Sequence, residues 1–405
     1  MRVSRLRSTA AIVMILALLL VACSSSKKTS TAASGGSGAS GSSGGGISAT
    51  AFTSDFSAMA QLKSLATSGK GMIGVLLPDT TTSARYESFD RPYLEKAFQN
   101  AGLSSDQYKI DNAQGSASTM QTQAEADITN GASVLLVDAL DSGSGAAIES
   151  SAEAKGVKVI DYDRLVKGGS PDRTYVSFDN VDVGKLIGQG FVDCVTQFKV
   201  NKPNVLVMDG DPTDNNATLF AQGYNGVLQP KFDSGDYVKV GEPAGTWTPS
   251  VAATTFDQQY TAHPNINSAI TPNDDNANAV IASLQKLNIP AQTFPTTGQD
   301  ASLSGLQNVL KGFQCGTVYK PIYLEAQAAA AVAIYLRAGQ QPPAALVNGM
   351  TQDSQTNSSV PSVLLKATWV TVDNMAATVV KDGAVTVANL CVTAVATKCT
   401  AVGIK

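Results

Sequence analysis

The chain has 405 residues, of which 43% are hydrophobic and 15% are charged, so it is long enough for two ordinary domains with apolar cores. Its formal net charge of -4 provides no basic surface for a phosphate backbone, which argues against nucleic acid as a partner. A single histidine, His263, nearly removes histidine-based triads and histidine-rich metal sites, so any chemistry must rest on carboxylates, amides, guanidinium groups and aromatic rings.

The first 22 residues have the pattern of a secretory signal peptide. Three arginines within residues 1–7 precede the apolar run 10–22, which is too short for a comfortable membrane span. Cys23 comes directly after Leu20-Val21-Ala22, and this order resembles the lipobox of bacterial lipoproteins, in which the cysteine is lipidated and becomes the mature N-terminus. The alternative is an ordinary signal peptide with a chance cysteine, but the next segment favours the lipoprotein.

That segment, residues 24–46, consists almost wholly of Ser, Gly, Ala, Thr and Lys, and it cannot bury a core. With Cys23 it makes up a predicted tether over 23–46. A Gly/Ser coil of this length has a root-mean-square reach of roughly 25–30 Å, which would hold the folded part of the chain that far from a membrane.

From Gly71 onward, short apolar runs alternate with longer amphipathic stretches, which predicts parallel strands covered on both faces by helices. In the first half, strands are expected at 72–78, 106–115, 132–139 and 157–164. The helices between these strands are expected at 86–102, 120–131 and 146–156.

The same alternation restarts after Asp179. Strands are expected at 204–210, 237–243, 266–274, 292–300 and 315–321. Helices are expected at 183–195, 216–232, 251–263, 276–288, 303–312 and 322–339, followed by a Pro-rich polar tail. The predicted fold class is therefore α/β, with two doubly wound, Rossmann-like lobes of similar size.

Four cysteines remain if Cys23 is lipidated, and an even number outside the cytoplasm favours disulfides over metal ligation. Cys391 and Cys399 bound the short segment CVTAVATKC and form the first predicted pair. Cys194 and Cys315 are left as the second pair. The alternative is four buried free thiols.

Polar side chains follow most of the predicted strands. Parallel sheets bind ligands beyond the carboxyl ends of their strands, because helix N-termini and loops converge there. The side chains found in this way are Asp79, Arg85, Tyr86, Asp141, Asp163, Arg164, Asn215, Asn216, Trp247, Asn273, Asp274, Asp275, Asp300 and Lys320. A sugar hydroxyl both donates and accepts hydrogen bonds, and the apolar face of a pyranose packs on an aromatic ring, so this set suits a carbohydrate.

Each of these residues also has a simpler interpretation. Asp and Asn after a strand commonly cap the next helix, which would account for Asn273 and Asp163 taken singly. Arg85 and Lys320 alone would be solvated surface charges, and Trp247 alone would be a half-buried core residue. The collective pattern favours a binding site.

Several motifs together resemble the periplasmic D-xylose-binding protein family, whose members are type 1 periplasmic sugar-binding proteins of ABC transporters. They occur in that family's order and are ARY (84–86), GVKVIDYDRL (156–165), YVSFDNVDVGKL (175–186), DPTDNNATLF (211–220), PND (272–274), GQDA (298–301) and TVYKPI (317–322). The resemblance extends from about Gly71 to Asp382. The resemblance selects nine residues as those that grip the ligand between the lobes, with Trp247 stacking on the sugar ring: Arg85, Tyr86, Asp163, Arg164, Asn216, Trp247, Asn273, Asp300 and Lys320. Tyr86 stands where that family usually has Trp, which leaves the sugar's identity open.

The resemblance implies a type 1 periplasmic binding protein fold with a three-segment hinge. The N-terminal lobe is expected at 47–178 plus 320–350 and the C-terminal lobe at 179–319 plus 360–405. Chain crossings are expected near 174–180, 317–321 and 348–363. Sugar would bridge the lobes and shift an open to closed equilibrium that a transmembrane permease reads.

We therefore expect a monomeric, lipid-anchored solute-binding protein on the outer face of the cell membrane, without a cofactor and without enzymatic activity. The expected ligand is D-xylose or a related pentose or aldose. One alternative is a sensor that reports the sugar to a membrane signalling receptor. Another is a glycoside hydrolase with Asp163 and Asp300 as paired carboxylates, but their basic and amide neighbours suit ground-state binding better. A DNA-binding repressor is disfavoured, because a signal peptide and tether stand where its helix-turn-helix would be.

Overall fold

The structure is a computed structural model that describes residues 46–80, 83 and 85–405. The predicted signal peptide, Cys23 and the tether up to residue 45 lie outside the described residues, as does Ala84 of the ARY motif. The described residues belong to one compact unit. Among the described helices, none combines the length and the apolar character that a bilayer crossing requires.

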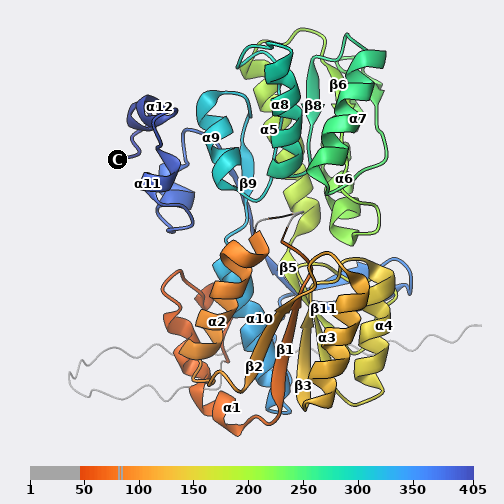
Figure 1. The fold of residues 1–405 in the computed structure, drawn as a ribbon, viewed down its shortest axis with the longest axis vertical. Coiled ribbons are helices and arrows are strands. Elements are labelled where there is room, and N and C mark those ends of the chain that lie inside the picture. Colours follow the sequence, from red (N-terminus) through yellow and green to blue (C-terminus); the bar gives the residue numbers. More distant parts are fainter. Residues whose placement is uncertain (1–45, 81–82, 84) are drawn as a thin grey trace, which may run out of the picture. The chain divides into compact units, whose positions relative to one another are not determined.

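The N-terminal lobe contains a seven-stranded sheet in the order β10-β11-β5-β4-β3-β1-β2 (Figure 1). Its strands are β1 (Met72–Leu77), β2 (Tyr108–Asn112), β3 (Ala132–Val137), β4 (Lys158–Tyr162), β5 (Thr174–Phe178), β10 (Gly349–Asp353) and β11 (Ser358–Leu365). All neighbouring strands are parallel except β10, which pairs antiparallel with β11. The predicted parallel sheet is thus confirmed, with two more strands contributed by the segment that we expected to be a polar tail.

Helices cover both faces of this sheet, as its apolar strands require. One face carries α10 (Ile322–Arg337), with α1 (Lys63–Ser68) and α2 (Arg91–Asn100) packed against it. The other face carries α3 (Ala117–Thr129) and α4 (Ser142–Glu153). Helix α10 is buried along most of its length because its alanines allow close packing over β1, β3, β4 and β5.

The C-terminal lobe has a parallel sheet in the order β7-β6-β8, built from β6 (Asn204–Val207), β7 (Val238–Gly241) and β8 (Ser268–Ile270). A second sheet pairs β9 (Thr317–Tyr319) antiparallel with β12 (Thr368–Val370). The helices are α5 (Asn180–Gln197), α6 (Asn215–Asp233), α7 (Pro249–Ala262), α8 (Asp274–Lys286) and α9 (Leu303–Lys311). The strand predicted at 292–300 is wrong: within this segment the structure has a single isolated strand-type bridge, between Gln299 and Val318.

Three chain crossings connect the lobes. They run from β5 to α5, from β9 to α10 and from β11 to β12. The third crossing lies between Leu365 and Thr368, later than the expected 348–363, because residues 358–365 form β11 within the large sheet. The predicted start of the C-terminal lobe at residue 360 is corrected accordingly. The backbone N–H of Asp179 donates to the carbonyl of Leu365, which ties the first crossing to the third.

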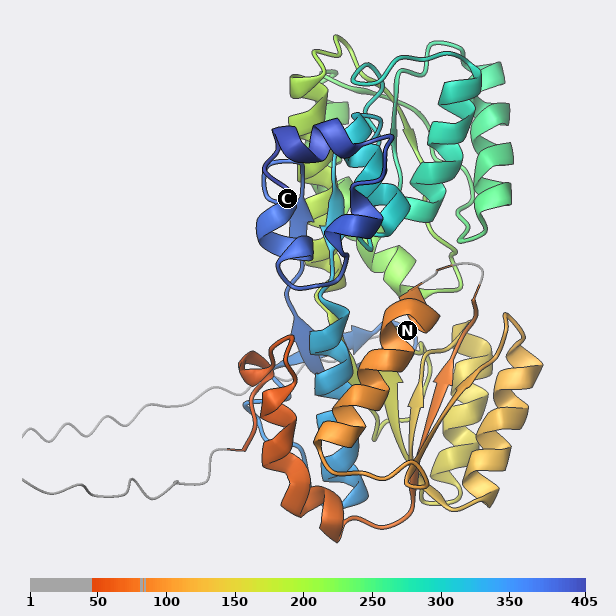
Figure 2. The same ribbon diagram turned by 60° about the vertical axis from the view of Figure 1, so that its left-hand side comes forward.

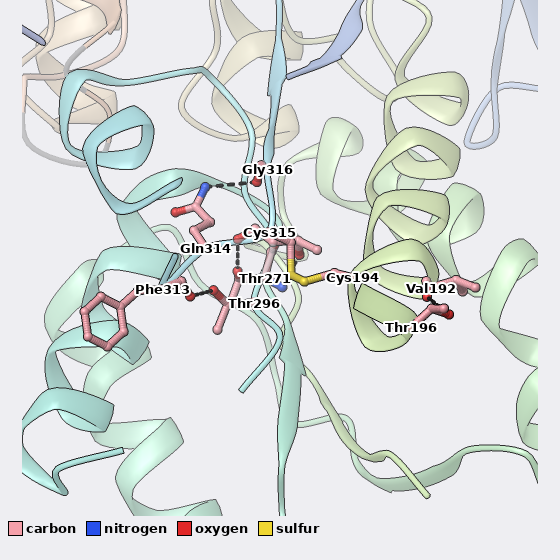
Figure 3. The surroundings of a disulfide bond; sticks show 10 residues. Val192, Cys194, Thr196, Thr271, Thr296, Phe313, Gln314, Cys315 and Gly316 are labelled. Atoms are coloured by element: carbon pink, nitrogen blue, oxygen red, sulfur yellow. Dashed lines mark hydrogen bonds between the residues drawn. A yellow bond between two sulfur atoms is a disulfide. The ribbon is translucent and has the colours of Figure 1, made fainter. Parts of the chain in front are cut away.

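Both predicted cysteine pairs form disulfides. Cys194 in α5 is bonded to Cys315, just before β9 (Figure 3). Cys391 is bonded to Cys399 in the C-terminal tail, where α11 (Val387–Leu390) and α12 (Ala396–Ala401) pack against α9 (Figure 2). The first bond therefore joins two elements that each lead to a crossing, and the second closes a short loop.

A buried acid pair lies in the N-terminal lobe away from the crossings. Glu149 of α4 and Asp161 of β4 share a hydrogen bond beside Arg173, whose Nε lies 3.0 Å from Asp161. Burial, followed by the Asp161 carboxylate, raises the pKa of Glu149 to about 10. The Glu149 Oε1 and Asp161 Oδ1 atoms are buried, and no N–H or O–H donor among the described residues reaches them, which fits a proton shared between the two carboxyl groups.

This pair predicts a stability that depends on pH. Because the folded pKa of Glu149 is raised above 4.5, its contribution is complete below pH 4.5 and is lost as the pH rises toward 10. Glu149→Gln should remove this loss, which amounts to up to ~1.4 kcal/mol per pH unit, because the amide can donate to Asp161 without titrating. Urea unfolding between pH 6 and 9 measures it, with the exposed Glu125→Gln as control. Parallel pH profiles for the wild type and Glu149→Gln would contradict the prediction.

Candidate functional site

One cavity, lined by side chains of both lobes, lies where the two lobes meet. All nine residues selected from the sequence line it. The complete lining is Ser83, Arg85, Tyr86, Asp163, Arg164, Asp214, Asn216, Phe220, Trp247, Asn273, Gln299, Asp300 and Lys320. Strand ends and helix N-termini supply most of these side chains, as expected at the carboxyl edges of parallel sheets.

Arg85 is held at the cavity by three buried carboxylates. Its guanidinium donates to Asp90 through Nε at 2.9 Å and Nη2 at 2.7 Å, to Glu325 through Nη2 at 2.8 Å and to Asp163 through Nη1 at 2.9 Å. Four of its five N–H groups are therefore engaged, and the second N–H on Nη1 has no partner among the described residues and faces the cavity that a ligand would fill. Burial raises the pKa of Glu325 to about 8, although the Arg85 cation opposes this rise.

Asp163 is ionised and fixed in place. Burial alone would raise its pKa, but the cations of Arg85 and Lys320 outweigh that effect and lower it to about 2. Its backbone is left-handed, with φ 58°, and its carbonyl accepts hydrogen bonds from Tyr175, Ser177 and Asn216. Such a sparsely populated conformation is kept only where surrounding contacts hold it, and it occurs preferentially at functional sites.

Lys320 and Asp300 present polar atoms that the described protein does not satisfy. The Lys320 ammonium lies 3.6 Å from Asp163 Oδ1 and 3.7 Å from Asp300 Oδ1, beyond normal hydrogen-bond length. Asp300 Oδ1 is buried and has no hydrogen-bond partner among the described residues. Burial raises the pKa of Asp300, and Lys320 opposes the rise. Because unpaired buried polar groups are costly, this pair indicates a ligand that both donates and accepts hydrogen bonds.

Trp247 provides the aromatic wall. Its six-membered ring packs on Gly210, where a Cβ atom would come within 2.2 Å of the indole, so only glycine permits this position. Phe220 meets Trp247 edge to face, with ring centroids 6.5 Å apart. The indole Nε1 donates to Asp214 Oδ2 at 3.0 Å. A half-buried indole held at its edge leaves its face available to an apolar ring surface.

Tyr86 and Arg164 contact each other. Arg164 Nη2 donates to the Tyr86 hydroxyl at 2.8 Å, and Arg164 Nη1 donates to the carbonyl of Ala139 at 3.2 Å. The Tyr86 ring lies beside the guanidinium groups of Arg164 and Arg85, with centroid distances of 5.7 and 5.3 Å. Tyr86 thus supports two cavity cations in addition to lining the wall.

The two asparagines already have protein partners. Asn273 caps α8 by accepting from the N–H of Asn276 at 2.9 Å, so the simpler interpretation holds for it alongside its place in the cavity wall. Asn216 donates to the Asp163 carbonyl at 2.9 Å and accepts from Asn180 at 2.9 Å. Asn216 therefore links the end of β4 to the start of α6.

Comparisons with known proteins agree with this geometry. Residues 73–341 match the family described as periplasmic binding protein domain. The D-xylose-binding periplasmic protein of Escherichia coli (strain K12) is 36% identical over 278 residues, which cover 68% of this chain and 80% of that protein. The chain belongs to the type 1 periplasmic sugar-binding protein family.

Two further relatives are named for carbohydrate binding or transport. The multiple sugar-binding periplasmic protein SbpA of Azospirillum brasilense is 29% identical and covers 78% of this chain and 89% of its own. A carbohydrate transporter solute binding protein from Chloroflexus aurantiacus, solved in complex with D-glucose, superposes with a TM-score of 0.68 at 27% identity. It covers 78% of this chain and 97% of its own.

Sequence reasoning missed several residues of this periplasmic sugar-binding protein's cavity. Asp214 and Phe220 lie within the DPTDNNATLF motif, so their closeness in sequence to Asn216 could have identified them as cavity residues. Ser83 and Gln299 also line the wall. Asp90 and Glu325, the counterions of Arg85, sit within helical segments that showed no strand-end pattern. Asp90 reaches Arg85 from five residues along the same helical segment, and Glu325 reaches it through the packing of α10.

Proposed function

We propose that this protein is an extracytoplasmic lipoprotein that captures a monosaccharide aldose, most specifically D-xylose or a related pentose, and delivers it to an ABC transporter permease. The observation that carries the proposal is the convergence of all nine selected side chains on one cavity between the lobes. The xylose-binding and multiple-sugar-binding relatives support the ligand class. Cys23 would carry the lipid anchor, and the protein would act as a monomer without a cofactor.

The contacts of the cavity favour binding over hydrolysis. Asp163 is ionised and paired with two cations, which stabilises the charged form and makes it a poor general acid. Lys320, Asp300 and the remaining Nη1 hydrogen of Arg85 offer donors and acceptors to sugar hydroxyls, and Trp247 offers an apolar face. Closure of the lobes around the sugar would then be read by the permease.

Isothermal titration calorimetry of the chain beginning at Gly46 with a panel of monosaccharides tests the proposal. The panel should include D-xylose, L-arabinose, D-ribose, D-glucose and D-galactose. We expect micromolar or tighter binding of at least one aldose, with D-xylose ahead of the hexoses. If no pentose or hexose binds more tightly than millimolar, the proposed function is wrong. Preferred binding of D-glucose would retain the class and correct the sugar.

A further inference from the structure

Asp214 is a buried carboxylate placed between a residue of each lobe. It precedes α6 in the C-terminal lobe. Its Oδ2 atom accepts the Trp247 indole N–H at 3.0 Å and lies 3.3 Å from Nε of Arg164. Arg164 follows β4 of the N-terminal lobe, whereas Trp247 precedes α7 of the C-terminal lobe. A single carboxylate oxygen thus joins two cavity residues from opposite lobes.

Helix capping accounts for only one of the two oxygen atoms of the Asp214 carboxylate. Asp214 Oδ1 accepts the N–H of Asn216 at 2.8 Å, which is an ordinary N-cap bond. The other oxygen is committed to Trp247 and Arg164. Either Asn or Ser could supply the cap, but only a carboxylate provides the cap, an acceptor for the indole and a charge for the guanidinium.

Arg164 lies between two carboxylates, one from each lobe. Its Nε lies 3.4 Å from Asp138 Oδ1, at the end of β3 in its own lobe, and 3.3 Å from Asp214 Oδ2 across the cavity. Separation of the lobes would leave Arg164 with Asp138 and remove Asp214. The Arg164–Asp214 contact therefore exists only when the lobes are close together, and it acts on the oxygen that holds the Trp247 indole.

We propose that Asp214 is a positioning residue that couples lobe closure to the orientation of Trp247 and Arg164 around the sugar. This inference rests on the proposed sugar-binding function and deepens it. In the closed state, the Asp214 charge holds Arg164 from the opposite lobe while its oxygen holds the indole edge. Sugar then meets a stacking ring and a guanidinium that are already in place, which reduces the ordering required on binding.

Two substitutions test this role. Asp214→Asn retains the cap through its single oxygen, but it removes the charge that faces Arg164 and turns an amide NH2, which is a donor, toward the indole N–H. Asp214→Ser retains the cap and removes both other contacts. We expect affinity for the best-binding aldose to fall roughly 100-fold in both variants, mainly through faster dissociation. A residue that only capped α6 would give near wild-type affinity in both.

Trp247 fluorescence gives a readout that does not require sugar. The chain has two tryptophans, so a Trp369→Phe background leaves Trp247 as the sole indole. In this background, acrylamide quenching of the sugar-free protein should rise in both Asp214 variants. Small-angle X-ray scattering without sugar should show a larger radius of gyration in both. Asp211→Asn, which changes a carboxylate of the same loop that bonds only locally to Thr213, is the matched control.

The outcomes separate this inference from the function beneath it. If wild type binds no sugar, the proposed function fails, and quenching and scattering still decide whether Asp214 joins Trp247 to Arg164. If wild type binds sugar while both Asp214 variants match it in affinity, quenching and radius of gyration, the inference is overturned and the function stands.

Discussion

Replacing Asp163 with asparagine should lower sugar affinity at least ~100-fold. The substitution leaves the buried cations of Arg85 and Lys320 without their shared counter-charge, and a buried charge that loses its partner is strongly unfavourable, by about 3–5 kcal/mol. Asparagine tolerates the left-handed backbone at this position, so the effect comes from the lost charge and not from strain in the main chain. Calorimetry with the best-binding aldose measures the loss.

The effect of Asp163→Asn on sugar affinity must be distinguished from an effect on folding. Asp172→Asn, at an exposed carboxylate in the same stretch of chain, serves as the control. Circular dichroism melting curves establish a temperature at which all variants are folded, and binding is measured there. Since the folded pKa of Asp163 is depressed to about 2, its contribution to stability is present above pH 3.8 and is lost as the pH falls toward 2. Affinity within threefold of wild type in folded Asp163→Asn would contradict the proposed role.

Removing the Cys194–Cys315 disulfide should be the most destabilising change outside the cavity. The bond links residues separated by 121 positions, so it strongly restricts the unfolded chain. The chain-entropy relation gives about 5 kcal/mol for a loop of this length and about 2.5 kcal/mol for one of nine residues. The Cys194→Ser/Cys315→Ser double variant should therefore lose roughly twice the free energy of unfolding lost by Cys391→Ser/Cys399→Ser.

Urea unfolding of the two double variants against wild type measures this difference. The comparison is matched because each variant replaces two cysteines with serines and removes one disulfide. The Cys194–Cys315 bond also joins α5 to the segment before β9, so its loss should reduce sugar affinity by loosening two elements that lead to lobe crossings. A larger loss of stability from the tail disulfide would show that local packing, and not loop length, sets the effect.

The sheet cores were predictable because short apolar runs and amphipathic helices have different periods. β1, β3, β4 and α10 fall where that pattern places them. The hairpin β10–β11 was missed because its strands contain many polar residues and Pro361, so the segment was predicted to be a polar tail. In the structure, β11 pairs with β5 and both strands join the large sheet. Because of this long-range pairing, the third crossing lies later in the chain than predicted.

The residues of the candidate site were likewise predictable only in part. Strand ends identified a wide set of polar residues, since the carboxyl edge of a parallel sheet is a geometric consequence of the fold, and the family resemblance reduced that set to the nine residues that line the cavity. The partners of those residues could not be identified from the sequence. Asp90 and Glu325 reach Arg85 from positions 5 and 240 residues away, and Glu325 does so only because α10 crosses beneath the sheet.

The sequence by itself determined the class of the protein, because hydrophobic periodicity, strand-end polarity and recognisable motifs are local properties of the chain. The tertiary structure decided which charges pair, where the chain crosses between the lobes and which oxygen of Asp214 holds Trp247. These depend on distances between segments far apart in sequence, and electrostatic and hydrogen-bond energies are set by those distances.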